Sequence, residues 1–249
     1  MYGRHVVQDR VSITRLAPAL AARGLALDDA QRERLDHFGH LLLEWNERVN
    51  LTAITTPDEI ATKHFLDSLT LLLARPPRAG ARLVDVGTGA GFPGIPLAIA
   101  RTDLRVTLVE SVGKKVRFLE AVVAALGLRN VDPVQARAEE LARDPTRRER
   151  YDVAVARALP SLATNLELLL PFCAVGGEAV AYKGRIEAEL PAAGRAASAL
   201  GGEISAVVPT SSLGLGDELP GRRLVIVAKR NRTPAAYPRG PAEMKRRAW

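Results

Sequence analysis

The residues with the clearest chemical potential are two acids and the cluster of glycines between them. One apolar run ends at Asp85, residues 87–94 contain four glycines, and the next apolar run ends at Glu110. Glycine lets backbone approach a ligand closely, and a helix that starts after such a turn offers free N–H groups. A carboxylate after the second strand can bind both hydroxyls of a ribose. The pattern predicts a site for a nucleoside-containing cofactor.

The register of the glycines separates two kinds of cofactor. Residues 89–94 match the dinucleotide pattern G-x-G-x-x-G, but the strand ends just before Gly87, which should be the first glycine of the turn. Counted from there, Phe92 stands where a dinucleotide fold has its third glycine. Pro93 and Pro96 also remove N–H donors that would face a pyrophosphate. The turn resembles the S-adenosylmethionine (SAM) site of Rossmann-like methyltransferases. A nicotinamide or flavin site, and a turn without a ligand, remain as alternatives.

Composition places the chain among ordinary globular proteins. It has 249 residues, of which 47% are hydrophobic and 25% charged. No apolar run reaches the roughly 18 residues of a membrane span, and the N-terminus lacks a signal pattern. A lone cysteine, Cys173, excludes internal disulfides and multi-cysteine metal sites. We expect a cytoplasmic protein without a metal and without a membrane partner.

The net charge of +7 is concentrated at the C-terminus. Residues 229–249 carry seven lysines and arginines against one glutamate, whereas residues 1–80 are balanced. Such a tail predicts contact with a polyanion, and a solubilising, disordered tail is the alternative.

The spacing of apolar residues divides the chain into three parts. Residues 1–80 read as a helical region, residues 81–230 as an α/β domain and residues 231–249 as the basic tail. Strands alternating with helices predict a mostly parallel, seven-stranded sheet, and the loop 210–221 predicts that it ends in an antiparallel hairpin. This is the methyltransferase version of the Rossmann plan. The expected strands are 82–86, 105–110, 130–135, 151–156, 178–183, 203–209 and 222–229. The expected helices are 113–126, 161–172 and 185–200, with a short turn near 138–143.

Four loops should meet at the carboxyl edge of this sheet, where ligands bind in open α/β folds. They carry the glycine turn, Glu110, Ala138-Glu139 and Arg157. The loop after the fourth strand has no Asp/Asn-Pro-Pro-aromatic motif for an exocyclic amine, and Cys173 reads as a small buried residue. The remaining acceptors are nucleophilic without a general base, as guanine N7 is, so no catalytic residue is assigned.

Several motifs occur together in one order and resemble the bacterial RsmG (GidB) family, which methylates guanine N7 in 16S ribosomal RNA. The resemblance spans roughly residues 35–240, and its most specific elements are Trp-Asn-x-x-x-Asn-Leu-Thr and Asp-Val-Gly-Thr-Gly-x-Gly. It departs at Ala236, where family members often have lysine. The matching segments are 45–54, 64–69, 85–96, 108–119, 156–158 and 237–239.

The resemblance implies SAM contacts at Gly87, Phe92, Ala138, Glu139 and Arg157. We expect Glu110 to hold the ribose, Ala138-Glu139 to frame the adenine, and Gly87 with Gly89 to admit the cofactor. Arg157 could hold the methionine carboxylate, contact RNA, or form a structural salt bridge.

The resemblance also implies a substrate, 16S ribosomal RNA or the small ribosomal subunit. We expect the enzyme to be a monomer. Candidate RNA contacts are Asn46, Asn50, His64, Lys183 and Arg239. Helix capping is the alternative for the asparagines, and a structural hydrogen bond for His64. Two other functions stay open: a SAM-dependent methyltransferase of small molecules and a non-enzymatic RNA-binding assembly factor.

Overall fold

A seven-stranded sheet forms the centre of the structure, a computed structural model that describes residues 11–249. The strand order is β3-β2-β1-β4-β5-β7-β6, with β7 antiparallel to both of its neighbours and the other pairs parallel. The predicted sheet and hairpin are therefore confirmed. The strands are β1 (Arg82–Val86), β2 (Arg105–Glu110), β3 (Val131–Gln135), β4 (Tyr151–Arg157), β5 (Cys173–Lys183), β6 (Gly202–Pro209) and β7 (Arg223–Lys229).

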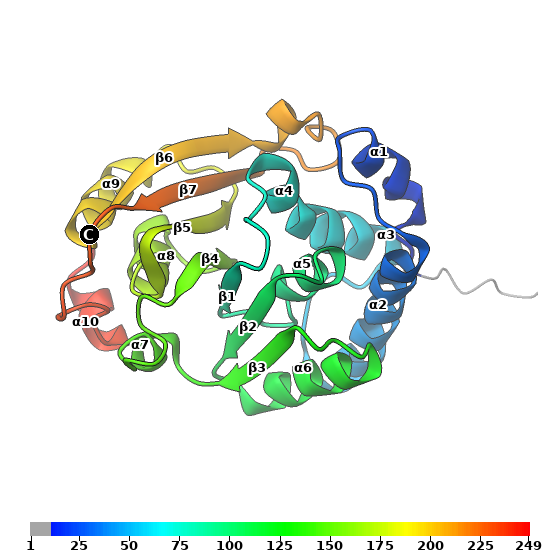
Figure 1. Cartoon of the computed structure of the whole chain (residues 1–249), viewed down its shortest axis with the longest axis horizontal. Helices are drawn as coiled ribbons and strands as arrows, with labels where there is room; N and C mark the ends of the chain where they lie inside the picture. Colours follow the sequence, from blue (N-terminus) through cyan, green and yellow to red (C-terminus); the bar gives the residue numbers. More distant parts are fainter. Residues whose placement is uncertain (1–10) are drawn as a thin grey trace, which may run out of the picture.

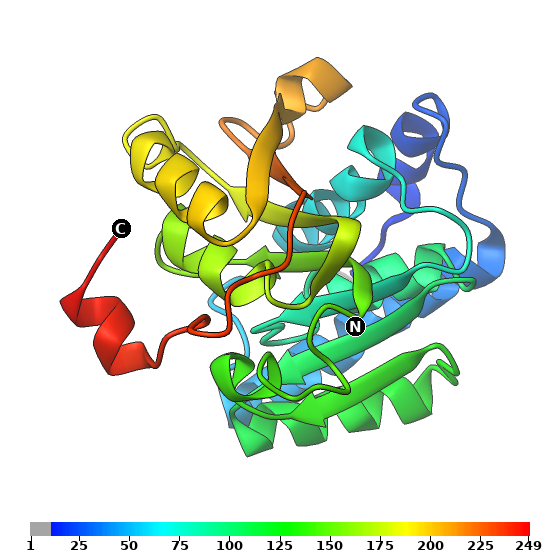
Figure 2. The same cartoon turned by 60° about the vertical axis from the view of Figure 1, so that its left-hand side comes forward.

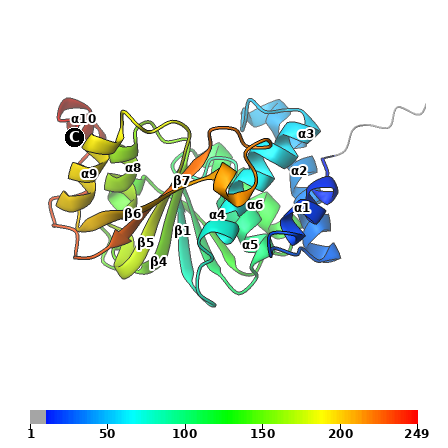
Figure 3. The same cartoon turned by 90° about the horizontal axis from the view of Figure 1, so that it is seen from above.

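Helices cover both faces of the sheet (Figures 1 and 3). One layer contains α4 (Asp67–Ala74), α5 (Gly94–Ala100) and α6 (Gly113–Ala125); the other contains α7 (Ala138–Leu141), α8 (Leu162–Leu169) and α9 (Leu190–Ala199). Alternate residues of β1 face the two layers: Leu83 belongs to the core under α5 and α6, and Val84 to the core under α8 and α9.

The N-terminal helices form an outer layer on the α5–α6 side (Figure 1). The longest, α2, begins with a capping box between Asp28 and Gln31 and packs against α5 and α6 through Leu35 and Phe38. Because these side chains share one core with the sheet, the described part of the helical region is not packed separately. Its first ten residues lie outside the described part, including those in which a signal pattern was sought. The remaining elements are η1 (Thr14–Leu16), α1 (Ala17–Ala21), α3 (Pro57–Glu59) and the π-helix η2 (Ile60–Leu66).

Three segments differ from the expected boundaries. Helix α9 begins at Leu190 because Pro191 occupies its first turn, whereas a start at residue 185 was expected. Helix α8 ends at Leu169, so Cys173 opens β5 instead of closing a helix. The loop between β6 and β7 contains a short 3₁₀ helix, η3 (Thr210–Leu213).

The C-terminal segment after β7 runs along the α8–α9 side and ends in α10 (Pro241–Arg246) (Figure 2). Arg148 and Arg143 hold it by donating hydrogen bonds to backbone carbonyls of residues 233–238. No helix formed by residues 11–249 combines the length and apolar character that crossing a membrane requires.

Candidate active site

The glycine turn after β1 is hydrogen-bonded to the adjacent strand β2. The backbone N–H groups of Gly87 and Thr88 donate to the carbonyl of Val109, and Gly87 and Gly89 have φ values of 67° and 61°. L side chains rarely adopt such values, which explains glycine at both positions. A Cβ at Gly89 would have nothing within 4 Å, so this side of the turn faces open space.

Asp85, at the end of β1, holds the glycine turn by hydrogen bonds to both of its ends. Its Oδ2 accepts hydrogen bonds from the Thr88 hydroxyl at 2.6 Å and from the Gly94 N–H at 2.8 Å. Its Oδ1 is buried without a hydrogen-bond partner among the described residues. Burial raises the pKa of Asp85 to about 6, against the opposing effect of these hydrogen bonds. The carboxylate orders the turn and keeps one acceptor available.

Glu110 connects the glycine turn to the end of β2. Its two carboxylate oxygens accept from the Gly89 N–H at 3.1 Å and from the Val112 N–H at 2.9 Å. Each oxygen retains a second lone pair for a ligand hydroxyl. The next strand brings the third predicted loop alongside, since Glu110 pairs with Gln135 of β3.

Ala138 and Glu139 open α7 beside this pair of strands. The Glu139 carboxylate is largely buried, with Oε1 3.6 Å from Nε of Arg137 and no hydrogen bond. Thus the glycine turn, Glu110 and the start of α7 follow three adjacent strands at one edge, as the sequence predicts.

Arg157, at the end of β4, connects this edge to the N-terminal helices. One nitrogen, Nη1, donates to the Lys63 carbonyl at 2.8 Å and to Asp67 Oδ2 at 3.2 Å, and Nη2 donates to His64 Nδ1 at 2.8 Å. The guanidinium also lies over the ring of Phe92, 5.0 Å from its centroid. Nη1 also forms an ion pair with Asp67, so the structural salt bridge expected as one alternative is present.

His64 is held as a neutral ring. Because Arg157 donates to Nδ1, the ring proton lies on Nε2, which donates to the Thr52 hydroxyl at 2.9 Å. The ring stacks on Phe92 at a centroid distance of 4.4 Å. Burial and the neighbouring Arg157 charge lower the pKa of His64 to about 3. His64 therefore carries no charge near neutral pH and positions Arg157.

Asp67 and Arg222 complete the cluster, and the sequence did not indicate Arg222. Both carboxylate oxygens of Asp67 accept from Arg222, at 3.0 and 2.7 Å. Arg222 stands 155 positions later in the chain and has no motif of its own, so only the tertiary fold could reveal the pair. Asp67 Oδ2 also accepts from Arg157, which in turn donates to His64.

A cavity of about 530 Å³ opens beside this cluster. The loop after β4 separates it from the glycine turn: Leu159 lines the cavity, and its Cδ2 lies 3.2 Å from the place of a Gly87 Cβ. Ala158 in that loop has φ 61°, a strained value of the kind that clusters at functional sites. The charged and polar residues of the wall are Lys63, His64, Asp67, Arg157, Tyr182, Lys183, Arg185, Glu189, Glu218 and Arg222.

Glu218 differs from the other carboxylates of the cavity wall. Asp67 pairs with two arginines, and Glu189 pairs with Lys183 at 3.1 Å. Glu218 has no hydrogen bond or ion pair to any residue between 11 and 249, so its acceptors are available to a ligand. No sequence motif marked it.

The other candidate RNA contacts fall in different places. Asn46 accepts from the N–H groups of Leu51 and Thr52 and so caps the end of α2, while Asn50 is its exposed left-handed residue. Lys183 lines the cavity. Arg239 lies away from it, where the buried Glu167 accepts from its backbone and its guanidinium.

Phe92 is almost fully buried beneath Arg157 and His64, in contact with Phe38 and Phe65. The structure gives it a packing role, and its predicted contact with the cofactor stays a prediction. Cys173 is buried as expected, and burial raises the pKa of its thiol to about 12. Within residues 11–249, no cluster of three histidines, cysteines or acids is arranged to bind a metal.

The residues at this edge fit SAM. The open space beside Gly89 admits a ligand, the unpartnered Asp85 Oδ1 is an acceptor for a cationic amine, and Glu110 retains lone pairs for a ribose diol. The expectation that Ala138 and Glu139 frame the adenine stays a prediction.

Comparison with known sequences gives one consistent result. The sequence model of the family described as rRNA small subunit methyltransferase G (GidB) matches residues 31–214. A protein of that name from Roseiflexus castenholzii is 50% identical over 87% of this chain and 91% of its own length. Another, from Brevibacillus brevis, is 44% identical over 90% of this chain and 93% of its own length.

Solved structures support the fold. A SAM-dependent methyltransferase from Aquifex aeolicus has a TM-score of 0.51 at 19% identity, covering 69% of this chain and 92% of its own. The ribosomal protein L11 methylase of Lactobacillus delbrueckii has a TM-score of 0.51 at 14% identity, covering 68% and 79%.

Proposed function

The chain belongs to the family of small-subunit rRNA methyltransferases G, and from this premise we propose that it transfers the SAM methyl group to N7 of a guanosine in 16S ribosomal RNA. Membership in the family makes it a SAM-dependent rRNA methyltransferase. The proposal adds the atom, the base and the RNA. It includes a cytoplasmic, monomeric enzyme that acts where ribosomal subunits assemble.

The observation that carries the proposal is the position of the cavity directly beside the glycine turn. Leu159 lines the cavity and lies 3.2 Å from the place of a Gly87 Cβ, so a base in the cavity and a cofactor against the turn would meet at the loop after β4. Bound SAM supplies an electrophilic methyl group. The chain then needs to hold the base so that its lone pair faces that methyl group at near-attack distance.

The chemistry of the cavity wall suits guanine. Guanine presents N–H donors on one edge and the O6 and N7 acceptors on another. The free Glu218 carboxylate can accept from the N–H donors, and Lys183 or Arg222 can donate to O6, which leaves N7 unprotonated and directed at the methyl group. Because N7 carries a free lone pair, the chain needs no general base, and His64 with a pKa near 3 is already engaged with Arg157.

The cations at the mouth of the cavity suit an RNA strand. Lys63 and Arg185 are exposed, and Arg222 is half-buried, so phosphates on either side of the flipped base could pair with them. A small-molecule methyltransferase has no evident use for this cationic rim.

Incubation with [methyl-³H]SAM tests the function. We expect label in 16S RNA when purified chain meets small ribosomal subunits or their RNA, and none in a metabolite extract. The inactive variant is Gly89→Asp, which places a side chain in the open space beside the turn and should remove labelling. Gly80→Asp is the matched control, because it carries the same left-handed strain in open space and should lower the melting temperature by a similar amount while labelling persists. Label confined to metabolites would refute the proposal. If subunit maturation required the chain but was still supported by Gly89→Asp in cells, the chain would instead act as a non-enzymatic assembly factor.

A further inference from the structure

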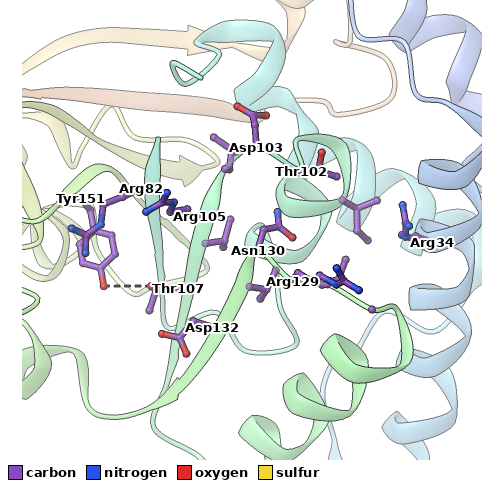
Figure 4. A pocket seen from close by; sticks show the side chains of 16 residues that line it. Arg34, Arg82, Thr102, Asp103, Arg105, Thr107, Arg129, Asn130, Asp132 and Tyr151 are labelled. Carbon is purple, nitrogen blue, oxygen red and sulfur yellow. Dashed lines mark hydrogen bonds between the residues drawn. The ribbon is translucent and has the colours of Figure 1, made fainter. Parts of the chain in front are cut away.

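A broad groove lined by arginines lies at the opposite edge of the sheet, across the amino ends of β1 to β4. Its volume is about 940 Å³. Four arginines line it from four different segments: Arg34 from α2, Arg82 from the start of β1, Arg105 from the start of β2, and Arg129 from the turn before β3 (Figure 4). None of these residues belongs to the site at the carboxyl edge.

These four guanidinium groups lack acidic partners. No carboxylate of residues 11–249 lies within 4 Å of any of them, and Arg82 instead lies over the Tyr151 ring, 5.3 Å from its centroid. Arginines close to the same edge are paired: Arg78 with Asp152 at 2.8 Å and Arg101 with Asp103 at 2.7 Å. The absence of pairing is therefore a property of the groove and not of arginines at this edge in general.

The acids of the groove do not neutralise it. Asp103 is held by Arg101, and Asp132 lies 3.5 Å from Arg147; neither arginine lines the groove (Figure 4). Each acid is thus already balanced by a cation of its own. The groove keeps the full positive charge of its four arginines, three of which are exposed and one half-buried.

We propose that this groove binds the phosphate backbone of the substrate RNA, at a point separate from the base that is methylated. Guanidinium groups pair with phosphate through two hydrogen bonds, and arginine is the preferred residue for this contact. This inference rests on the proposed function, because it takes the substrate to be RNA.

The layout of the groove favours a strand of RNA over a small anion. A small anion is held where several donors converge on one point, whereas these arginines are distributed along the edge from β1 to α2. The strands are five to seven residues long, so about 20 Å separates this edge from the active site. A folded RNA can reach both edges at once, and a single nucleotide cannot.

The test compares two triple variants that remove equal charge. The groove variant is Arg82→Gln, Arg105→Gln and Arg129→Gln, all exposed positions. The control is Arg75→Gln, Arg195→Gln and Arg230→Gln, also exposed and outside the groove. Binding of each protein to deproteinised 16S RNA is measured over a range of salt concentrations, together with SAM affinity and methylation kinetics.

The affinity for RNA falls as salt rises, and we expect this dependence to be weaker in the groove variant. The magnitude of the slope of log affinity against log salt should decrease by about 2, since each lost single-strand phosphate contact removes about 0.7. Its KM for RNA should rise several-fold, while SAM affinity and kcat at saturating RNA stay at wild-type values. The control variant should keep the wild-type slope.

An unchanged slope and KM in the groove variant would overturn the inference while leaving the proposed function intact. If both triple variants lost RNA affinity equally, the effect would come from net charge alone, which would also overturn the inference. Tripolyphosphate is the probe for a small-anion site: if it binds the wild type but not the groove variant, and RNA binding is equal in both, the groove holds a small anion. Absence of RNA methylation by the wild type itself would instead refute the proposed function.

Discussion

At the residue scale, Arg157 joins three parts of the molecule. It ends β4, lies over Phe92 and donates to His64 and Asp67 of the N-terminal helices. Both of its terminal nitrogens are engaged in this way, whereas its neighbour Glu218 in the cavity wall has no hydrogen bond or ion pair among residues 11–249.

Glu218→Gln tests whether Glu218 recognises the N–H donors of guanine. The amide can accept only through its oxygen and has lost the charge, so we expect kcat/KM for RNA to fall about 10- to 100-fold, the range for a good bidentate base contact. Glu187→Gln is the matched control, because Glu187 is exposed and paired with Arg223 outside the cavity. Steady-state methylation of 16S RNA measures both. Equal activity of Glu218→Gln and the wild type would remove Glu218 from base recognition.

His64 predicts a specific dependence of stability on pH. Its pKa is about 3 in the folded chain and about 6.5 when unfolded, so the unfolded state takes up the proton first as the pH falls. The contribution of neutral His64 is complete above pH 6.5 and is lost between pH 6.5 and 3, at no more than about 1.4 kcal/mol per pH unit.

Urea unfolding between pH 4.5 and 7.5 measures this dependence. His64→Gln keeps an acceptor for Arg157 but cannot titrate, so its free energy of unfolding should fall less steeply with acid than that of the wild type. Parallel curves for the two proteins would show that His64 is not held neutral.

At the scale of elements, the glycine turn combines two separate requirements. Gly89 has a left-handed backbone beside open space, while a Cβ at Gly94 would lie 2.3 Å from Leu108 and 2.9 Å from Asp85 Oδ2. Gly89 therefore leaves room for a ligand, and Gly94 allows the start of α5 to pack closely against Leu108 of β2 and Asp85 of β1.

Three alanine substitutions separate these requirements. Gly89→Ala and Gly80→Ala impose the same left-handed strain of about 1–2 kcal/mol, with open space at both positions, but only Gly89→Ala should weaken SAM binding, by tenfold or more. Gly94→Ala should mainly lower the melting temperature, since it overpacks the core. Calorimetry with SAM and thermal unfolding measure the two effects. Equal SAM affinities for Gly89→Ala and Gly80→Ala would contradict the assignment.

The sequence predicts those elements whose signal is local. Strands β1 and β2 were predicted to the residue because each is a short apolar run that opens from a turn and ends at an acid or a glycine turn. The start of β5 was expected at residue 178 instead of Cys173 because Gly176 and Gly177 interrupt the apolar run. In the site, the strand-end residues were found because parallel strands align their ends. Arg222 and Glu218 were not, because their proximity depends on the β6–β7 connection folding back over α4.

At the scale of the whole molecule, the basic tail is partly a structural clamp. Lys229 is buried and donates to the Leu170 carbonyl at 2.8 Å, and Arg239 pairs with the fully buried Glu167 at 2.6 Å. Trp249 donates its Nε1 hydrogen to the same carboxylate. Four of the seven cations of residues 229–249 thus pair with acids outside this segment: Lys229 and Arg232 with Glu149, Arg230 with Glu203, and Arg239 with Glu167.

Arg239→Met tests the clamp. Removing one partner leaves the Glu167 charge buried, so we expect a loss of about 3–5 kcal/mol in the free energy of unfolding. Arg230→Met, which breaks an exposed pair with Glu203, should cost no more than about 1 kcal/mol. Denaturant titration compares them, and adding Glu167→Gln to Arg239→Met should restore part of the loss. If both single variants lowered the free energy of unfolding by a similarly small amount, the tail would be only loosely attached to the domain.

The central claim concerns one atom of one base in 16S RNA. Mass spectrometry of that RNA, from cells that contain the wild-type chain or only the Gly89→Asp variant, measures it directly. The account predicts one 7-methylguanosine present with the wild type and absent with the variant. A 7-methylguanosine content that is identical in both RNAs would contradict it.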